Sequence, residues 1–398
     1  MATPASSSRR THERPDEGRP IYLDYAATTP VDPRVAEEVM HFMLEEFGNA
    51  GSRTHSYGQA AKERVNRARA EVAAVVDAKP DEVIFTSGAT ESNNLAILGL
   101  APHGEKSGKK HIVSTQIEHK AVLEPLAELE RRGFEVDLVP PTRGGWVDAD
   151  EVVARVRDDT LLVSVMAVNN ETGVIQPTDE VAGALTAGGA YFHVDAAQAF
   201  GKLVGPLRNS RIDLVSMSGH KIGAPKGIGA LIARRRRFSR PPLAPLMVGG
   251  GQERGLRPGT LPVPLVAGLG LASALAVEFG EERQTLLRDV RREFSSRLHG
   301  IGAQSNADES RAMPGILNVY VPGIDSEAAI VALKGVAAIS NGSACTSQSY
   351  DSSHVLTAAG ATTAEIEGAL RFSFDETLSA KAMDAIVKRL RVMKTAPA

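Results

Sequence analysis

Cysteine is almost absent from this sequence, since only Cys345 among its 398 residues carries a thiol. A lone thiol excludes a disulfide within the chain, so we expect a reducing compartment, the cytoplasm. An excess of one charge is also lacking, because 45 basic residues stand against 48 acidic ones and leave a formal charge of -3. This balance gives no reason to expect direct nucleic-acid binding or membrane binding as the main activity.

Long hydrophobic runs and targeting signals are missing as well. We identify no apolar stretch that should span a bilayer, and residues 1–20 lack the apolar centre of a signal peptide. These first residues are polar, and we expect them to form a disordered leader. The sequence therefore predicts no membrane partner.

The remaining composition is that of a globular protein, with 42% hydrophobic and 23% charged residues. From residue 83 to residue 215, short apolar runs alternate with segments of helical periodicity. The runs predict strands at 83–85, 111–114, 135–139, 161–168, 191–194 and 212–215. Repeated strand-helix units predict an α/β fold with a mostly parallel sheet and helices on both faces.

The pattern changes after Arg237, where a segment rich in glycine and proline precedes helical periodicity over residues 265–298. The elements expected after it are strands at 316–321, 336–339 and 370–374, a helix at 326–333 and a last helix from Leu378. We predict a large domain at 21–265 and a small α+β domain at 266–398, which N-terminal residues could complete. The basic run at 234–237 is interpreted as a solvated strand end or as a contact for an acidic partner.

Lys221 lies on a turn that follows the apolar strand ending at Val215. Open α/β sheets bind ligands at the carboxyl ends of their strands. A lysine there could form a Schiff base with a carbonyl cofactor, while Ser218 and His220 offer hydrogen bonds to an anion. The alternative is a solvated loop lysine.

A neighbouring strand ends in Asp195, and Gln198 follows three residues later. Pyridoxal phosphate needs a carboxylate that keeps its pyridine nitrogen protonated, because that proton makes the ring an electron sink. Asp195 fits this role. Its other interpretation is an N-cap for the following helix.

Three further strand ends carry candidate ligands. Gly88, Ala89 and Thr90 form a turn into a helix, whose backbone N–H groups can bind a phosphate. His119 could stack on an aromatic cofactor, and Asn170 could bond a phenolic oxygen or the substrate. A surface histidine and a turn-forming asparagine pair are the alternatives for these two residues.

Cys345 and Arg371 are the candidates for substrate chemistry. Small polar residues surround Cys345, which predicts an exposed thiol and favours a nucleophile over a buried structural cysteine. Arg371 lies in a predicted strand, where its guanidinium could hold a substrate carboxylate in a bidentate fashion. A surface ion pair is the alternative for Arg371.

These segments together resemble the cysteine desulfurases of the NifS/IscS type, in the class-V aminotransferase family of fold-type I pyridoxal phosphate enzymes. The resemblance runs in order through residues 22–30, 86–94, 118–120, 169–171, 193–196, 218–221, 257–260 and 342–347. It implies a large domain with a mostly parallel seven-stranded sheet flanked by helices, and a small α+β C-terminal domain. Ala50, Pro258 and Asn341 depart from the usual family motifs, and these differences bear on which acceptor protein docks near residues 340–360.

The resemblance also implies roles for individual residues. Lys221 would hold the cofactor, Asp195 would pair with its pyridine nitrogen, and His119 would stack on its ring. The other implied cofactor ligands are Ala89, Thr90, Ser218 and His220 at the phosphate, with Gln198 and Asn170 near the phenolic oxygen. Thr260 would reach the phosphate of a neighbouring subunit, which implies a homodimer, and no metal ligands are expected.

The implied reaction converts L-cysteine to L-alanine and a persulfide on Cys345. Arg371 and Asn170 would bind the substrate, while Lys221 and His119 would move protons. A sulfur-acceptor protein would take the persulfide sulfur, for iron–sulfur assembly, tRNA thiolation or DNA phosphorothioation. The alternative is a class-V aminotransferase or lyase that acts on another small amino acid.

Overall fold

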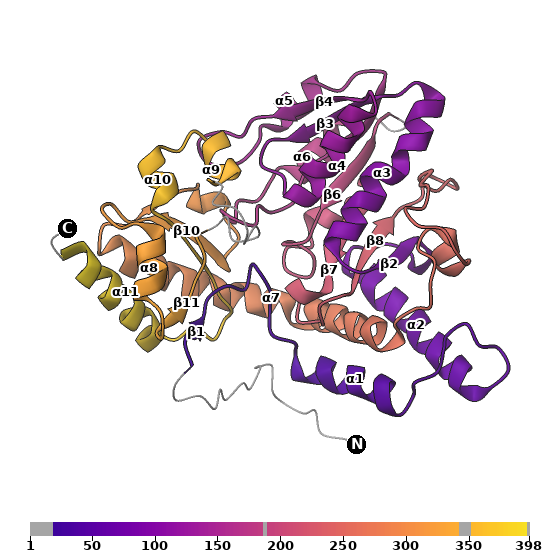
Figure 1. Cartoon of the computed structure of the whole chain (residues 1–398), viewed down its shortest axis with the longest axis horizontal. Coiled ribbons are helices and arrows are strands. Elements are labelled where there is room, and N and C mark those ends of the chain that lie inside the picture. The colour runs from indigo at the N-terminus through magenta and orange to yellow at the C-terminus, as the bar shows by residue number, and fades with distance from the viewer. Residues whose placement is uncertain (1–18, 186–188, 342–351, 396–398) are drawn as a thin grey trace.

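The structure is a computed structural model that describes residues 19–185, 189–341 and 352–395 (Figure 1). Most of the expected leader, residues 1–18, lies outside the described residues. Cys345 lies outside them as well. The fold and the site are therefore built from the remaining chain.

Seven strands of the described chain form the central sheet, in the order β2-β8-β7-β6-β5-β3-β4. They are β2 (Val83–Thr86), β3 (His111–Thr115), β4 (Glu135–Val139), β5 (Thr160–Ser164), β6 (Tyr191–Asp195), β7 (Leu214–Ser218) and β8 (Gly229–Ala233). The five strands from β7 to β4 are mutually parallel, and β8 runs antiparallel to both β2 and β7. This mostly parallel sheet confirms the predicted fold class, although β8 itself was not predicted.

Helices cover both faces of this sheet because its strands are apolar on both sides. In β2, Val83 and Phe85 pack on one face of the sheet and Ile84 packs on the other, as the alternation of a strand requires. The helices of the Ile84 face are α3 (Ala89–Ser107) and α4 (Lys120–Arg131). The opposite face is covered by α2 (Ser56–Val75), α6 (Thr178–Ala184), α5 (Ala149–Ala154) and the first half of α7 (Val263–His299), with α1 (Pro33–Leu44) packed outside.

A second, smaller core lies around an antiparallel sheet of β9 (Gln304–Ser305), β10 (Ile316–Tyr320) and β12 (Ala369–Ser373). It packs against α8 (Ser326–Ala332), α11 (Ala380–Thr395) and the end of α7, while α9 (His354–Ala358) and α10 (Thr363–Glu367) precede β12 in the chain. The N-terminal strand β1 (Ile21–Tyr22) pairs in parallel with β11 (Ala337–Ala338). Residues from the start of the chain therefore belong structurally with the last third.

The helix α7 spans 37 residues and contributes to both cores (Figure 1). Val266 and Leu269 pack in the first core, and Phe294 and Leu298 in the second. Its apolar first half is long enough to cross a bilayer by composition alone, so the expectation that no such stretch exists was wrong. Just over half of that apolar window, 56%, is buried inside the protein, because this half of the helix packs against α1 and α2.

Two local predictions also differ from the structure. The strand expected to reach Val168 ends at Ser164, after which the backbone leaves the sheet towards a loop. The basic run is not simply solvated: the Arg234 side chain is buried and donates to the carbonyl oxygens of Val76, Leu207, Asn209 and Ile212. The charged guanidinium can be buried because four backbone carbonyl oxygens accept its hydrogen bonds.

Candidate active site

A cavity of about 510 Å³ opens at the carboxyl edge of the central sheet. The turns after β2, β3, β5, β6 and β7 converge there, as expected for an open α/β sheet. The lining includes ten of the residues predicted from the sequence, namely Gly88, Ala89, Thr90, His119, Asn170, Asp195, Gln198, Ser218, His220 and Lys221. Arg371 and Thr260 do not line it, and Cys345 lies outside the described residues.

Asp195 is buried at the end of β6 and is fixed by two donors. The Asn93 side-chain amide donates to one carboxylate oxygen at 2.7 Å, and the backbone N–H of Ala197 donates to the other at 2.8 Å. Hydrogen bonds from neutral donors orient a carboxylate without neutralising it. Asp195 can therefore act as an oriented acceptor for a cationic ring nitrogen. Sequence reasoning did not single out Asn93, although it lies in the quoted segment 86–94.

Lys221 ends a short 3-10 turn that follows β7, Gly219–Lys221. Its Nζ donates to the carbonyl oxygens of Ala26 at 2.5 Å and Ala27 at 2.8 Å. The segment between β1 and α1 thus crosses the cavity and orients the amine. These two backbone acceptors carry no side-chain signal that would reveal them in the sequence.

The start of α3 lies beside the ends of β7 and β8. A Cβ atom on Gly229 would lie 2.5 Å from the Met217 carbonyl oxygen and 2.6 Å from Gly88 Cα, so only glycine permits this close approach. The first residues of the 19-residue helix α3, Ala89 and Thr90, therefore line the cavity together with Ser218. Such a helix start is an anion site, which matches the predicted place of a phosphate.

His220, which lines the same cavity, lies in a positively charged environment. Burial and the charges of Lys221, Lys226 and Lys202 lower the pKa of His220 to about 4. The imidazole is therefore neutral at pH 7, and its Nδ1 lies 3.1 Å from Thr28 Oγ1. An anion bound here would be stabilised by the lysines and would raise the pKa of His220.

His119 is the N-cap residue of α4. Its Nδ1 accepts the backbone N–H of Ala121 at 3.0 Å. The neutral ring consequently carries its proton on Nε2. That nitrogen is the one able to exchange a proton with a bound molecule.

Arg371 is buried, with 1% of its side chain exposed, and is held at the rim of the site. It forms an ion pair with Asp24 at 2.7 Å and donates to the Asn170 carbonyl oxygen at 3.0 Å. Its Nε has no hydrogen-bond partner among the described residues. The alternative of a surface ion pair is wrong, because this pair is internal, and the carboxylate-binding role of Arg371 stays a prediction.

Thr260 is exposed and lies apart from the cavity of its own chain. Nearby, Arg257 pairs at 3.2 Å with Glu91, whose other oxygen accepts the backbone N–H of Ser87 at 2.7 Å. This segment thus packs beside the start of α3 with Thr260 facing outward. Its predicted contribution to a neighbouring subunit stays a prediction.

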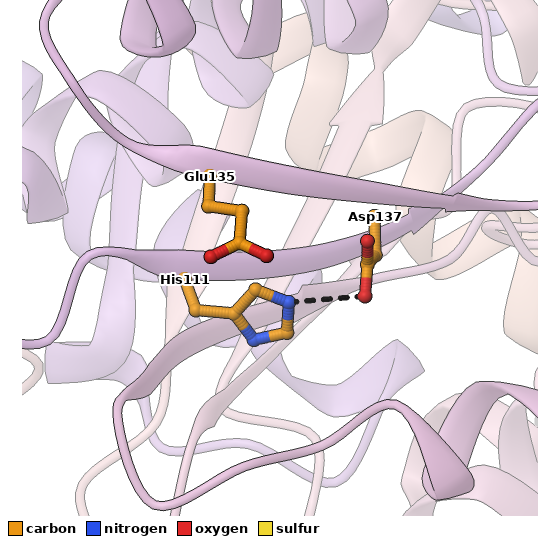
Figure 2. A group of neighbouring side chains, drawn as sticks. All are labelled: His111, Glu135 and Asp137. Atoms are coloured by element: carbon orange, nitrogen blue, oxygen red, sulfur yellow. Dashed lines mark hydrogen bonds and ion pairs between the residues drawn. The ribbon is translucent and has the colours of Figure 1, made fainter.

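His111, Glu135 and Asp137 form a separate group at the opposite edge of the sheet, on β3 and β4 (Figure 2). Their ligand atoms lie within 4.8 Å of one another, and Figure 2 shows the imidazole joined to Asp137. Arg157, however, already donates to both oxygens of Glu135, and Thr160 bonds the second imidazole nitrogen. We therefore interpret this group as an ion-pair network that joins the edge strand to the sheet.

The cavity fits pyridoxal phosphate. An amine, a buried carboxylate and an anion-binding helix start lie on one edge, matching the aldehyde, the pyridine nitrogen and the phosphate of that molecule. The side-chain oxygen of Gln198 is also buried without a partner among the described residues, while its amide donates to Ala26. Buried acceptors are seldom left unpaired, so a bound polar molecule is expected beside it. Fold and site together define a fold-type I enzyme dependent on pyridoxal phosphate.

Comparison with known proteins agrees with this class. The family model described as aminotransferase class-V matches residues 21–385. Cysteine desulfurase IscS of Salmonella paratyphi B is 46% identical over 94% of this chain and 92% of its own length. Among solved structures, a NifS-like protein superposes with a TM-score of 0.86 at 36% identity, covering 94% of this chain and 98% of its own. DndA from Streptomyces lividans superposes with a TM-score of 0.78 at 51% identity, covering 89% of this chain and 99% of its own.

The chain therefore belongs to the class-V aminotransferase family and, within it, to the pyridoxal phosphate-dependent cysteine desulfurases.

Proposed function

We propose that the cavity converts L-cysteine to L-alanine and that Cys345 receives the sulfur as a persulfide. The observation that carries this proposal is the placement of Lys221 and Asp195 in one cavity beside an anion-binding helix start. Pyridoxal phosphate, when bound, supplies an aldehyde for the substrate amine and a ring that accepts electron density.

Lys221 is the proposed base for the α-proton of the substrate. The carbonyl oxygens of Ala26 and Ala27 hold its amine within the cavity, so proton transfer requires little reorientation. Asp195 would pair with the pyridine nitrogen of the bound cofactor. Its two donors, Asn93 and Ala197, keep the carboxylate in place.

His119 and Arg371 are the proposed substrate contacts. The Nε2 proton of His119 can be exchanged with the substrate thiol, since Nδ1 is engaged by the backbone. Arg371 retains donor capacity at Nε after its bonds to Asp24 and Asn170. Asn170 lies between Arg371 and the cavity and would contact the same substrate.

The described chain that leads to Cys345 is anchored beside Arg371. Ser340 exchanges two backbone hydrogen bonds with Arg371, at 2.7 and 3.3 Å. Cys345 follows Asn341 by four residues, a distance of at most roughly 14 Å of extended chain. Its thiolate would attack the substrate sulfur and form an S–S bond. The electron pair of the broken C–S bond would remain on the substrate carbon, which takes a proton to give alanine.

The proposal extends to a shared-site homodimer and a sulfur-acceptor protein. An exposed Thr260 outside its own cavity supports a contribution to a second subunit, and Met40, Leu44 and Phe47 leave exposed apolar surface around α1. Apolar surface of this kind favours an interface. The destination of the sulfur, among iron–sulfur assembly, tRNA thiolation and DNA phosphorothioation, depends on that acceptor.

The test is Cys345→Ser compared with wild type and with Lys221→Ala. We expect Cys345→Ser to keep the visible absorbance of the bound cofactor and to lose alanine and sulfide formation from L-cysteine at least about 100-fold. Lys221→Ala should lose both the absorbance and the turnover. Full cysteine turnover by Cys345→Ser, or turnover only with a keto-acid co-substrate, would instead support an aminotransferase or another lyase.

A further inference from the structure

Glu118 is a buried carboxyl group beneath the cavity that the reaction above does not use. It follows β3 and directly precedes His119, and its side chain is fully inaccessible to solvent. One oxygen accepts the Thr115 hydroxyl at 3.0 Å and the backbone N–H of Met166 at 2.7 Å. Thr115 ends β3, whereas Met166 follows β5 and lines the cavity. The Glu118 side chain thus joins the carboxyl ends of two adjacent strands.

The backbone of Glu118 makes a third connection. Its carbonyl oxygen lies 2.9 Å from His354 Nε2, at the start of α9. The next residue, His119, caps α4 through its own imidazole. Three elements that are separate in the chain, β3, α4 and α9, therefore meet at the residue that precedes the proposed ring-stacking histidine.

The surroundings of Glu118 oppose a negative charge. Its second carboxyl oxygen is buried without a hydrogen-bond partner among the described residues. Burial, together with the charge of Asp195, raises the pKa of Glu118 to about 8, against the opposing effect of its two hydrogen bonds. At neutral pH the group is consequently a carboxylic acid. Asp195, by contrast, has a donor on each of its oxygens.

We propose that Glu118 is a positioning residue that works as an uncharged acid. It holds the ends of β3 and β5, next to His119 and Met166, in register. The inference rests on the proposed roles of His119 and Asp195. It concerns how those groups are held, and it adds no step to the reaction.

Three variants of the full-length protein test this proposal. Glu118→Gln keeps the shape and the acceptor oxygen but cannot ionise. Glu118→Ala removes the link between the strands. The matched control is Glu82→Ala, since Glu82 is also buried and accepts two backbone N–H groups, from Lys79 and Arg235, at the opposite end of the sheet.

The readouts are the dissociation constant of pyridoxal phosphate, the absorbance spectrum of the bound cofactor and thermal unfolding. Glu118→Gln should match wild type in the dissociation constant of pyridoxal phosphate and in the absorbance spectrum. Glu118→Ala should weaken cofactor binding about tenfold or more and shift the absorbance band, because the buried Met166 N–H loses its acceptor beside the ring. Glu82→Ala should unfold at a lower temperature with an unchanged dissociation constant and band.

Two results would overturn the proposal. Equal defects in Glu118→Gln and Glu118→Ala would mean that the ionised form is required. If Glu118→Ala, like Glu82→Ala, only unfolds at a lower temperature and keeps its cofactor binding, Glu118 contributes to the stability of the fold and does not position the site.

Infrared spectroscopy tests the charge state even if Glu118→Ala fails to fold. The protonated-carboxyl stretch at pH 7 should be present in wild type and absent from Glu118→Gln, and its absence from wild type would overturn the proposal. These readouts require neither Cys345 nor cysteine turnover. Failure of the desulfurase reaction would therefore be distinguishable from failure of this inference.

Discussion

Burial sets the protonation states of individual residues around the cavity. His193 lies behind Asp195, between the hydroxyls of Ser164 and Ser216, and burial lowers its pKa to about 4. His220 has a similar value, for which burial and three lysines are responsible. Both rings are neutral near pH 7, so neither adds a positive charge to those of the lysines.

This state of His220 predicts how the stability of the cofactor-free protein depends on pH. The folded pKa of about 4 lies below the unfolded value of about 6.5, so only the unfolded chain gains this proton as the pH falls between those values. The contribution of neutral His220 to the free energy of unfolding is therefore fully present above pH 6.5 and is lost as the pH falls towards 4. We expect cofactor-free His220→Asn to lose less free energy of unfolding than wild type over this range, measured by denaturant titration.

Two comparisons complete that experiment. His41→Asn, on α1 and outside the cavity, should keep the wild-type dependence. Added pyridoxal phosphate should flatten the dependence in wild type, because its phosphate would raise the pKa of His220. An identical pH dependence in wild type and His220→Asn would contradict this account.

The sequence allowed ten cavity residues to be predicted because strand ends and turns mark the carboxyl edge of a parallel sheet. It did not reveal the partners of those residues. The carbonyl oxygens that orient Lys221 are backbone atoms, which every residue has. Asn93 and Glu118 act through contacts with residues distant in sequence, and Arg234 is buried because four separate carbonyls converge on it. Such contacts exist only once the chain has folded.

At the scale of elements, the unpredicted strand β8 is what brings the start of α3 against β7. The residues before β8 are rich in glycine and proline, which hid the strand from pattern analysis. Gly229, its first residue, is the point of closest approach to Gly88. The proposed phosphate site at the start of α3 therefore depends on a strand that contributes no ligand side chain.

Gly229→Ala should disturb this site. The added Cβ would meet two backbone atoms at 2.5 and 2.6 Å, so either β8 or the Gly88 turn must shift. We expect a loss of about 1–3 kcal/mol in the free energy of unfolding together with weaker pyridoxal phosphate binding. The control is Gly183→Ala in α6, whose Cβ would meet nothing within 4 Å. Indistinguishable cofactor binding by the two variants would show that the site tolerates the shift.

At the scale of the whole molecule, the two cores are joined by α7 and by the pairing of β1 with β11. The ion pair between Asp24 and Arg371 and the hydrogen bond from Tyr25 to Asp375 strengthen the second connection. The segment that orients Lys221 therefore continues directly from a strand of the smaller core. Movement of one core relative to the other would be transmitted to the amine of Lys221.

Shared sites in a homodimer can be tested by mixing subunits. Thr260→Ala and Lys221→Ala proteins should each have low activity alone. After unfolding and refolding together, heterodimers should contain one intact site, and activity should recover to about one quarter of the wild-type value. The control is Thr260→Ala mixed with the double variant, which can form no intact site. No recovery in the first mixture, or a monomer by analytical ultracentrifugation, would contradict the proposed dimer.

The pairing of β1 with β11 also orders events during synthesis on the ribosome. Ile21 emerges early, but its partner Ala337 emerges only near the end of translation, at about 5–20 residues per second. Until then the neighbouring Ala26 and Ala27 have no anchored strand from which to reach Lys221. A chain that ends before residue 337 keeps the bonds of this segment to His220 and Gln198 but lacks its attachment to the smaller core. The segment that contacts Lys221 is therefore fixed at both of its ends only after β11 has been synthesised.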